Sequence, residues 1–265
     1  MLRPRIIPCL LVHNGGLVKT RGFAEPKYVG DPLNAVRIFN EKEVDELIVA
    51  DIDATVRNSE PDYDLIANLA AECRMPLCYA GGVKTVSQFE TIVGLGVEKV
   101  AIGSAAIRNP ELISGAAETV GRQSVVVVLD IRKTGLLRRY EVVTENGRWK
   151  SGMNPVDVAI DAEKRGAGEI LLNSVDQDGM MTGFDFKLAD EVRSQISIPM
   201  SILGGAGSLS DIEKAIARYG IVGAAAGSLF VFKGKYRAVL IQYPNHSEKE
   251  SIFKAAEQQH SRVSE

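Results

Sequence analysis

Glycines that follow short apolar runs form two similar groups in this sequence. The first is Gly81-Gly82 with Gly103-Ser104, and the second is Gly204-Gly205 with Gly227-Ser228. A phosphate needs several converging backbone N–H donors, and glycine lets the backbone approach closely. We therefore expect two phosphate sites and a small-molecule ligand with two phosphates. Each glycine pair taken alone could simply make a tight turn.

The two groups are spaced as an internal repeat. Gly205 follows Gly82 by 123 residues, Ser228 follows Ser104 by 124, and Asp176 follows Asp53 by 123. A constant offset over three positions indicates that one half of the chain duplicates the other.

Carboxylates also follow the apolar runs. Asp130 ends the run Val125–Leu129, and Asp51, Asp53, Asp176 and Asp178 follow two other runs. Asp130 is the candidate general acid or base, because partial burial can adjust the pKa of a carboxyl group. An aspartate at this position can also simply cap a turn, and this alternative stays open for Asp53.

Four charged residues stand at or before the starts of apolar runs, at the opposite end from the aspartates. They alternate in sign along the chain: Arg5, Glu46, Lys99 and Glu169. Such residues are usually solvated or form a stabilising ring, and the residues alone give no reason to prefer a function.

The elements that must position these residues are eight strands that alternate with helices. The apolar runs are Ile6–Leu11, Glu46–Asp53, Pro76–Gly81, Lys99–Ser104, Ser124–Asp130, Glu169–Asp176, Pro199–Gly205 and Gly223–Phe230. They are continuous, as in parallel strands buried on both faces, and amphipathic segments separate them. The fold class is therefore α/β: one (βα)8 TIM barrel of two half-barrel repeats over residues 1–243. An open doubly wound sheet is the main rival.

Two long segments, Val12–Gly30 and Ile131–Met153, follow strands at the end where barrel active sites form. Val12–Gly30 is expected to be a loop that carries Lys19. In Ile131–Met153, a Glu-Asn-Gly sequence predicts a hairpin. The polar tail 244–265 is expected to be mobile, with a short helix around 248–259.

Composition excludes several function classes. The net charge of −3 gives no general attraction to nucleic acid or to an anionic membrane. No apolar stretch is long enough for a membrane span, and the N-terminal run has no cleavage site of a signal peptide. Cys9, Cys73 and Cys78 lack metal-ligand spacing, so we expect free thiols in the cytoplasm, no metal and no cofactor.

Motifs along residues 1–235 together resemble the HisF family, the cyclase subunit of imidazole glycerol phosphate synthase. They include Ile6-Ile7-Pro8-Cys9-Leu10, Gly30-Asp31-Pro32, Asn109-Pro110-Glu111-Leu112-Ile113, Gly166-Ala167-Gly168-Glu169, Asp176-Gln177-Asp178-Gly179 and Gly204-Gly205-Ala206-Gly207. The resemblance implies a partner glutaminase, similar to HisH, at the amino-terminal face of the barrel. Ammonia released there passes through the barrel interior.

The resemblance also implies residue roles. Arg5, Glu46, Lys99 and Glu169 match the charged ring at the entrance of the ammonia channel, and Lys19 matches a lysine of the mobile first loop. One phosphate site is matched by Gly82, Gly103 and Ser104, although the family's usual Asn-Thr is Gly-Ser here. The other is matched by Asp178, Gly179, Gly205, Gly227 and Ser228. Asp130 matches one of two catalytic aspartates.

The second catalytic aspartate is absent, because Leu11 stands where the family has Asp in Cys-Leu-Asp-Val. Loss of a positioned acid or base typically costs a factor of ~10²–10⁴ in rate. Asp53 also replaces a usual threonine. The segments Glu25–Pro32 and Gly227–Lys235 are similar to a HisF-like branch associated with surface-polysaccharide genes. In that system the barrel and a glutaminase supply ammonia to a separate ATP-dependent amidotransferase that acts on an N-acetyl sugar.

The leading hypothesis is therefore an ammonia-conducting subunit that supports sugar amidation. The alternative is a working cyclase of histidine biosynthesis that uses Asp130 with a neighbouring carboxylate. A third hypothesis is an allosteric partner that activates a glutaminase without conducting ammonia. A phosphosugar isomerase is compatible with the fold alone, but the charged ring and the Lys19 loop argue against it.

Overall fold

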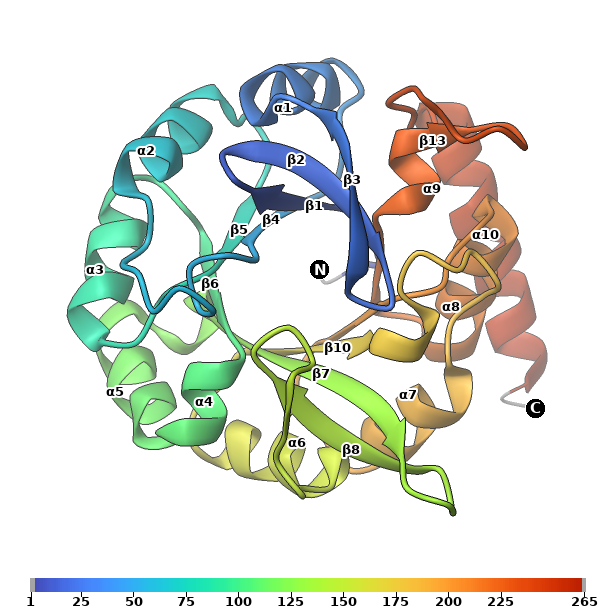
Figure 1. The fold of residues 1–265 in the computed structure, drawn as a ribbon. Coiled ribbons are helices and arrows are strands. Elements are labelled where there is room, and N and C mark those ends of the chain that lie inside the picture. Colours follow the sequence, from blue (N-terminus) through green and yellow to red (C-terminus); the bar gives the residue numbers. More distant parts are fainter. Residues whose placement is uncertain (1–2, 264–265) are drawn as a thin grey trace.

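Eight parallel strands close into a barrel, and helices cover its outside (Figure 1). The computed structural model describes residues 3–263. The barrel strands, in order around the barrel, are β1 (Arg5–His13), β4 (Leu47–Asp51), β5 (Leu77–Ala80), β6 (Lys99–Ile102), β7 (Val125–Thr134), β10 (Glu169–Ser174), β11 (Met200–Leu203) and β12 (Gly223–Ala226). β1 pairs with β4 on one side and with β12 on the other. The expected (βα)8 barrel is confirmed, and the open sheet is excluded.

The outer helices begin where the sequence provides caps. Asp31, Asp62 and Asp185 each accept a hydrogen bond from a backbone N–H in the first turn of the following helix. Thr85 and Ser208, which are 123 residues apart, both form capping boxes. The outer helices are α1 (Pro32–Glu41), α2 (Tyr63–Glu72), α3 (Val86–Gly94), α5 (Glu111–Val120), α6 (Pro155–Lys164), α7 (Phe186–Arg193), α8 (Leu209–Tyr219) and α10 (His246–Val263). Short α4 (Ser104–Arg108) and α9 (Ser228–Val231) follow β6 and β12 directly.

Two hairpins extend from the carboxyl ends of β1 and β7. The segment expected as a loop after β1 is instead β2 (Gly16–Arg21) and β3 (Ala24–Gly30), because β1 continues to His13 and pairs antiparallel with β2. After β7, β8 (Arg139–Thr144) and β9 (Trp149–Lys150) confirm the hairpin predicted from Glu-Asn-Gly. Glu145, Asn146 and Gly147 all have positive φ angles, as tight hairpin turns require.

The segment after Tyr243 is not a mobile tail, because α10 packs against α8 as the last helix of the barrel. Ile252 and Ala256 are buried, and Lys249 Nζ donates to Asp45 Oδ1 at 3.0 Å. The expectation of a mobile tail was based on the polar composition of this segment. Only one narrow face of the helix is apolar, and that face is sufficient for packing.

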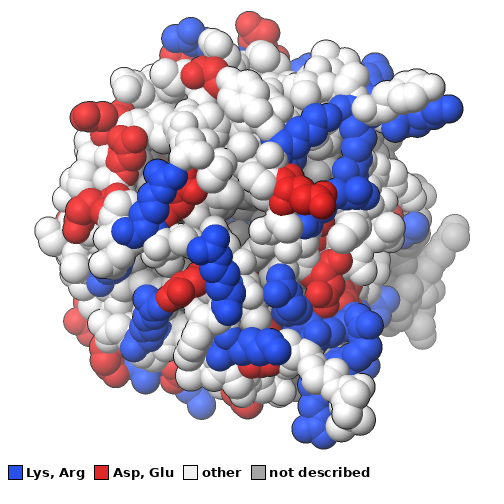
Figure 2. Space-filling model, in the orientation of Figure 1, with Lys and Arg blue, Asp and Glu red and all other residues white. Residues whose placement is uncertain are grey.

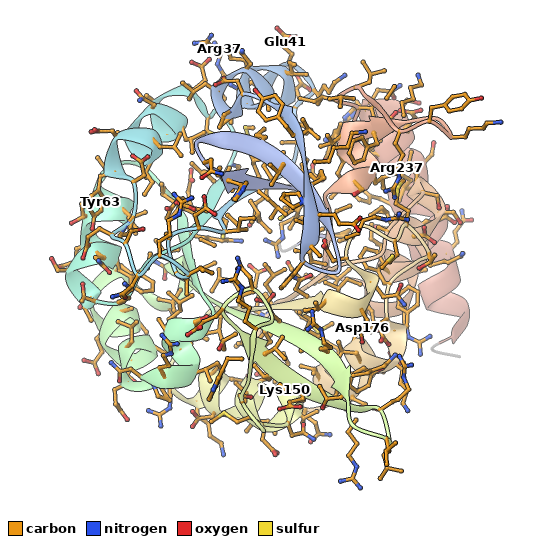
Figure 3. All side chains as sticks on the ribbon, in the orientation of Figure 1. Arg37, Glu41, Tyr63, Lys150, Asp176 and Arg237 are labelled. Carbon is orange, nitrogen blue, oxygen red and sulfur yellow. The ribbon has the colours of Figure 1, made fainter. Side chains whose placement is uncertain are left out.

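Two groups of apolar side chains form the core. The larger one lies between the strands and the outer helices, and includes Val36, Phe39, Phe89 and Ile212. The smaller one fills the barrel interior with Ile7, Cys9, Ile48, Cys78, Ala101, Val126, Leu171 and Ala225. Helix side chains such as Arg37 and Glu41 point outward (Figure 3). Among residues 3–263, no helix combines the length and the apolar character that crossing a bilayer requires.

Candidate active site

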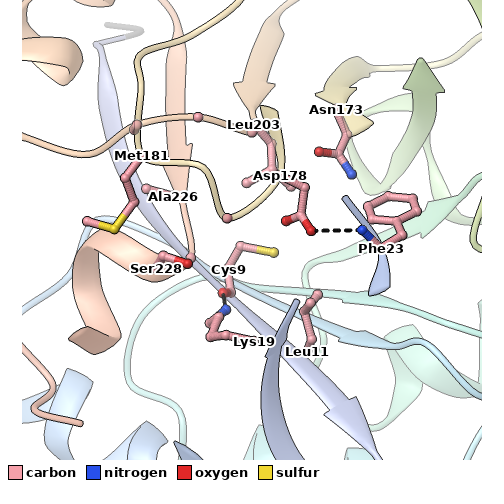
Figure 4. A pocket seen from close by; sticks show the side chains of 15 residues that line it. Cys9, Leu11, Lys19, Phe23, Asn173, Asp178, Met181, Leu203, Ala226 and Ser228 are labelled. Carbon is pink, nitrogen blue, oxygen red and sulfur yellow. Dashed lines mark hydrogen bonds between the residues drawn. The ribbon is translucent and has the colours of Figure 1, made fainter. Parts of the chain in front are cut away.

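A pocket opens at the carboxyl end of the barrel, where the sequence places its candidate catalytic residues. Leu11, Asp51, Ser104, Asp130 and Asn173 are among the residues that line it, and it encloses about 910 Å³, including space open to solvent. A smaller pocket of about 480 Å³ adjoins it near Lys19 and Gly227 (Figure 4). Cys9, Leu11, Asn173 and Leu203 border both pockets, so the two form one continuous mouth. A concave site lined by apolar and a few polar side chains is typical of small-molecule binding.

Asp130 lies at this mouth on β7, and its environment favours the protonated acid. Burial raises the pKa of its carboxyl group to about 6 and outweighs the hydrogen bond from Asn173. Asn173 Nδ2 lies 2.8 Å from Asp130 Oδ1. A carboxyl group with a pKa near 6 can both accept and donate a proton close to neutral pH, as general acid–base catalysis requires.

Leu11 occupies the mouth at the same end of β1. Its Cα partner on β4 is Ala50, and its partner on β2 is Val18. The side chain contacts the apolar interior group, and Leu203 does so from the opposite half of the barrel. Leu11 therefore gives the pocket an apolar surface. Of the two carboxylates predicted for catalysis, Asp130 is present and Leu11 stands at the position of the other.

The β2–β3 hairpin lies over the mouth and is held by the segment after β10 (Figures 1 and 4). Thr20 Oγ1 donates to Asp178 Oδ2 at 2.7 Å, and the Phe23 N–H donates to the same oxygen at 3.2 Å. Gly179 has a φ of +66°, and a Cβ there would lie 2.0 Å from the Thr20 carbonyl oxygen. Only glycine allows the two backbones to approach this closely.

Lys19 reaches inward from this hairpin. Its Nζ donates to the Cys9 carbonyl oxygen, and the side chain is buried. Burial lowers the pKa of Lys19, although Cys9 and Asp178 act in the opposite direction. A Cβ on Gly227 would lie 2.7 Å from Lys19 Nζ, so this glycine leaves the space that the ammonium group occupies.

The predicted phosphate loops have similar backbone conformations in the two halves. Gly82 and Gly205 have φ angles of +72° and +108°, and Gly103 and Gly227 have φ angles of −110° and −101°. Ser104 and Ser228 begin the short helices α4 and α9. The repeat in the sequence therefore corresponds to a repeat in three dimensions.

Asp178 differs from the other residues predicted to bind phosphate. Its N–H donates to the Val175 carbonyl oxygen, and its carboxylate accepts from Thr20 and Phe23. An ionised carboxylate has no proton to donate to phosphate. We infer that Asp178 holds the β2–β3 hairpin, and that Gly179 and Gly205 are the better candidates for phosphate contacts.

The four charged residues predicted to form a ring meet at the amino-terminal end of the barrel. Glu46 and Glu169 each contact both cations: Lys99 Nζ lies 2.9 Å from Glu46 Oε2 and 2.8 Å from Glu169 Oε2. Arg5 Nη2 lies 2.7 Å from Glu169 Oε1 and also pairs with Glu46. Burial would raise the pKa of Glu169, but Lys99 and Arg5 outweigh it and lower the pKa. Glu169 is therefore ionised at neutral pH.

Asp53 fastens the turn between β1 and β2 to the segment after β4. Its carboxylate lies 2.7 Å from His13 Nδ1 and 2.7 Å from the Asn14 N–H, and it pairs with Arg57 at 3.3 Å. The turn after β4 is capped by Asp51, which accepts from the Asp53 and Ala54 N–H groups. The aspartate that simply caps the turn after β4 is therefore Asp51, and Asp53 instead joins two segments.

Sequence reasoning missed Asn173, Thr20 and Phe23. Asn173 is buried, and it is the polar side chain that ends the apolar run from Ile170 to Leu172. Its position on β10, next to Asp130 on β7, was a usable signal, because adjacent parallel strands bring such residues together. Thr20 and Phe23 gave no signal, because their contacts depend on how the hairpin folds back.

Lys and Arg side chains gather around the mouth, although the chain has a net charge of −3 (Figure 2). Several acidic side chains on this face are already paired, for example Asp176 with Arg132 and Asp185 with Lys133. The face therefore favours an anionic ligand. Within residues 3–263, no cluster of three His, Cys, Asp or Glu side chains could hold a metal ion.

Comparisons with known proteins agree with this architecture. The family model described as "Histidine biosynthesis protein" matches residues 5–237. The chain belongs to this family. A relative from Leptospira interrogans, named "Putative imidazole glycerol phosphate synthase subunit HisF", is 56% identical over 253 residues, 96% of this chain and 100% of the relative.

Further relatives support membership in the HisF group of the family. The Pseudomonas aeruginosa protein named hisF2 is 52% identical over 92% of this chain and 97% of its own length. The imidazole glycerol phosphate synthase subunit HisF of Lactococcus lactis subsp. lactis is 40% identical over 87% of this chain and 89% of its own length. The family resemblance inferred from the motifs is thus confirmed.

Proposed function

We propose that the chain is the synthase subunit of a cytoplasmic glutamine amidotransferase and conducts ammonia through its barrel. A glutaminase similar to HisH would dock at the amino-terminal face, around the charged ring. A separate ATP-dependent amidotransferase would use the ammonia to amidate an N-acetyl sugar of a surface polysaccharide.

One observation carries this proposal. The charged ring, the apolar interior and the pocket mouth follow one another from the amino-terminal to the carboxyl end of the barrel. The ring of Arg5, Glu46, Lys99 and Glu169 is complete, and the apolar group around Ile48 and Leu171 separates it from the mouth. An apolar interior suits neutral ammonia, because a charged ammonium ion would lose its hydration there. At the mouth, Leu11 supplies no acid or base next to the arriving ammonia.

The second candidate function is the cyclase reaction of imidazole glycerol phosphate synthase in histidine biosynthesis. It is favoured by Asp130, whose pKa of about 6 suits proton transfer, and by the names of the relatives. The predicted residues for the two phosphates of its substrate are Gly82, Gly103 and Ser104 on one side, with Gly179, Gly205, Gly227 and Ser228 on the other.

Turnover of the two-phosphate aminoimidazole precursor with an ammonium salt separates the two candidates. We expect the protein to be slower than its own Leu11→Asp variant by a factor of ~10²–10⁴, the usual value of one positioned acid or base. Turnover equal to that of an Asp-containing HisF, with no gain in the variant, would refute the ammonia-supply proposal and support the cyclase.

A third possibility, an allosteric partner that does not conduct ammonia, is tested by Lys99→Met in complex with a glutaminase. A conduit with an altered ring should transfer less glutamine nitrogen to product, and free ammonia should appear in solution. If the chain only activates the glutaminase, the Lys99→Met variant should still activate it. The nitrogen transferred to product and the free ammonia should then both stay unchanged.

A further inference from the structure

The turn between β8 and β9, residues 145–148, lies against the first pair of predicted phosphate loops. The Glu145 N–H donates to Ser104 Oγ at 3.2 Å, and the Glu145 carboxylate pairs with Arg108 on α4. Asn146 Nδ2 donates to the Ile52 carbonyl oxygen at 2.8 Å. The Glu145 backbone therefore adjoins Ser104, a predicted phosphate contact, and the Glu145 carboxylate neutralises Arg108 on the same short helix.

The pocket beside this turn is lined by two cations. Lys84 and Arg108 border it together with Gly82, Gly103 and Ser104, and it encloses about 730 Å³, part of it open to solvent. Lys84 Nζ is held by neutral acceptors, 2.6 Å from Asn58 Oδ1 and 3.4 Å from the Ser59 carbonyl oxygen. Lys84 and Asn58 both line the pocket, and these two acceptors carry no charge that would neutralise the Lys84 ammonium group.

The second half of the barrel lacks this arrangement. The positions that correspond to Lys84 and Arg108 by the repeat offsets are Gly207 and Phe232, which carry no charge. There, cations reach the site from other elements: Lys19 from the β2–β3 hairpin, and Arg237, whose Nη2 donates to the Gly179 carbonyl oxygen at 2.7 Å. The two sites have similar backbones but obtain their positive charge from different elements.

We propose that Lys84 and Arg108 bind a phosphate dianion in the first site, and that Glu145 is an internal anion that the phosphate displaces from Arg108. The inference builds on the predicted phosphate loops. The Asn146 contact keeps the turn in place, so the exchange needs only a rotation of the Glu145 side chain. Glu145 thereby sets a threshold: a ligand must carry enough charge to compete for Arg108.

The exposure of the ion pair makes this exchange feasible. The Arg108 side chain is 57% exposed and that of Glu145 is 33% exposed. Ion pairs this open to solvent contribute little to stability, because water and salt screen them. A phosphate dianion carries more charge than a carboxylate and forms bidentate hydrogen bonds with a guanidinium group, so it competes effectively.

Titration of the protein with inorganic phosphate, followed by NMR, tests the inference at both sites at once. The amide signals of Gly82 and Gly103 report on the first site, and those of Gly205 and Gly227 on the second. We expect Glu145→Gln to tighten phosphate binding at the first site by about 3- to 10-fold, because it removes the competing anion. Arg108→Gln should weaken binding there by about 10-fold.

The double variant Arg108→Gln/Glu145→Gln decides between competition and a general charge effect. If Glu145 acts only by occupying Arg108, the double variant should bind phosphate like Arg108→Gln alone. A control, Arg139→Gln, changes an exposed cation of the same hairpin and should leave the affinity unchanged.

Three results would overturn the inference. The first is that Glu145→Gln does not increase the affinity for phosphate at the first site, and the second is that it increases it as much in the Arg108→Gln background as in the unsubstituted protein. The third is a loss of affinity in Arg139→Gln as large as that in Arg108→Gln. Shifts confined to Gly205 and Gly227 would also reject it while leaving the second phosphate site intact. If no glycine signal shifts, both this inference and the proposed phosphate loops fail.

Discussion

Removal of one carboxylate from the charged ring should destabilise the barrel strongly. Glu169 contacts both Arg5 and Lys99, and its side chain is only 7% exposed. Glu169→Leu leaves two cations to share Glu46. Breaking a buried ion pair by removing one partner costs about 3–5 kcal/mol, and we expect about 3 kcal/mol because Lys99 is 19% exposed. At about 2–4 °C per kcal/mol, the midpoint of thermal unfolding should fall by about 6–12 °C.

The double variant Lys99→Met/Glu169→Leu tests the cause. It restores equal numbers of charges, since Arg5 and Glu46 remain paired. Its loss of unfolding free energy should be smaller than the sum of the two single losses by about 1–3 kcal/mol. Urea unfolding followed by circular dichroism at pH 7 measures all three variants.

The exposed pair Arg37–Glu72 serves as a matched control on the outer helices, with side-chain exposures of 57% and 32%. A double-mutant cycle of this pair should give a coupling free energy of unfolding below about 1 kcal/mol. The pH dependence provides a further check. The pKa of Glu169 is lowered from 4.5, so its stabilisation is present above about pH 4.5 and is lost as the pH falls towards the lowered pKa. Loss of less than about 1 kcal/mol in Glu169→Leu, or purely additive variants, would refute the buried-ring argument.

Two further predictions concern the mouth. Burial raises the pKa of Asp130 from 3.8 to about 6, so its ionisation should cost the folded state about 3 kcal/mol as the pH rises through this window. Asp130→Asn should therefore be more stable than the unsubstituted protein at pH 8 but not at pH 3.5; equal stability at pH 8 would contradict the raised pKa. Gly179→Ala should lift the β2–β3 hairpin, because its Cβ would meet the Thr20 carbonyl oxygen, and limited proteolysis should cut this hairpin faster. Gly135→Ala, at a similar positive φ with no atom within 4 Å of its Cβ, should cost only about 1 kcal/mol and leave the cleavage rate unchanged; equal cleavage rates in the two variants would contradict the close-approach argument.

Local patterns were sufficient where the physics is local. Eight continuous apolar runs predicted the barrel strands, because a strand buried on both faces needs apolar side chains at every position. The offset of 123 residues predicted the twin loops, since a duplicated backbone needs its glycines at the same places. The Glu-Asn-Gly sequence predicted a turn, because Asn and Gly adopt the positive φ angles found there.

Contacts between distant segments could not be predicted in this way. The β2–β3 hairpin was expected as a loop because its fold depends on pairing with the end of β1. A short helix was expected around 248–259, but α10 was assigned to a mobile tail, because its stability comes from packing against α8 and its own composition is polar.

The sequence by itself determined the barrel, the two glycine loops, the four ring residues and the presence of leucine at position 11. Each of these depends on residue type and on spacing along the chain. Only the tertiary structure decided which charges meet. It paired Arg108 with Glu145 and Asp53 with His13, and it partly buried Asp130 beside Asn173. The pKa of a carboxyl group and the strength of an ion pair depend on distance and on burial, and neither is fixed until the strands close.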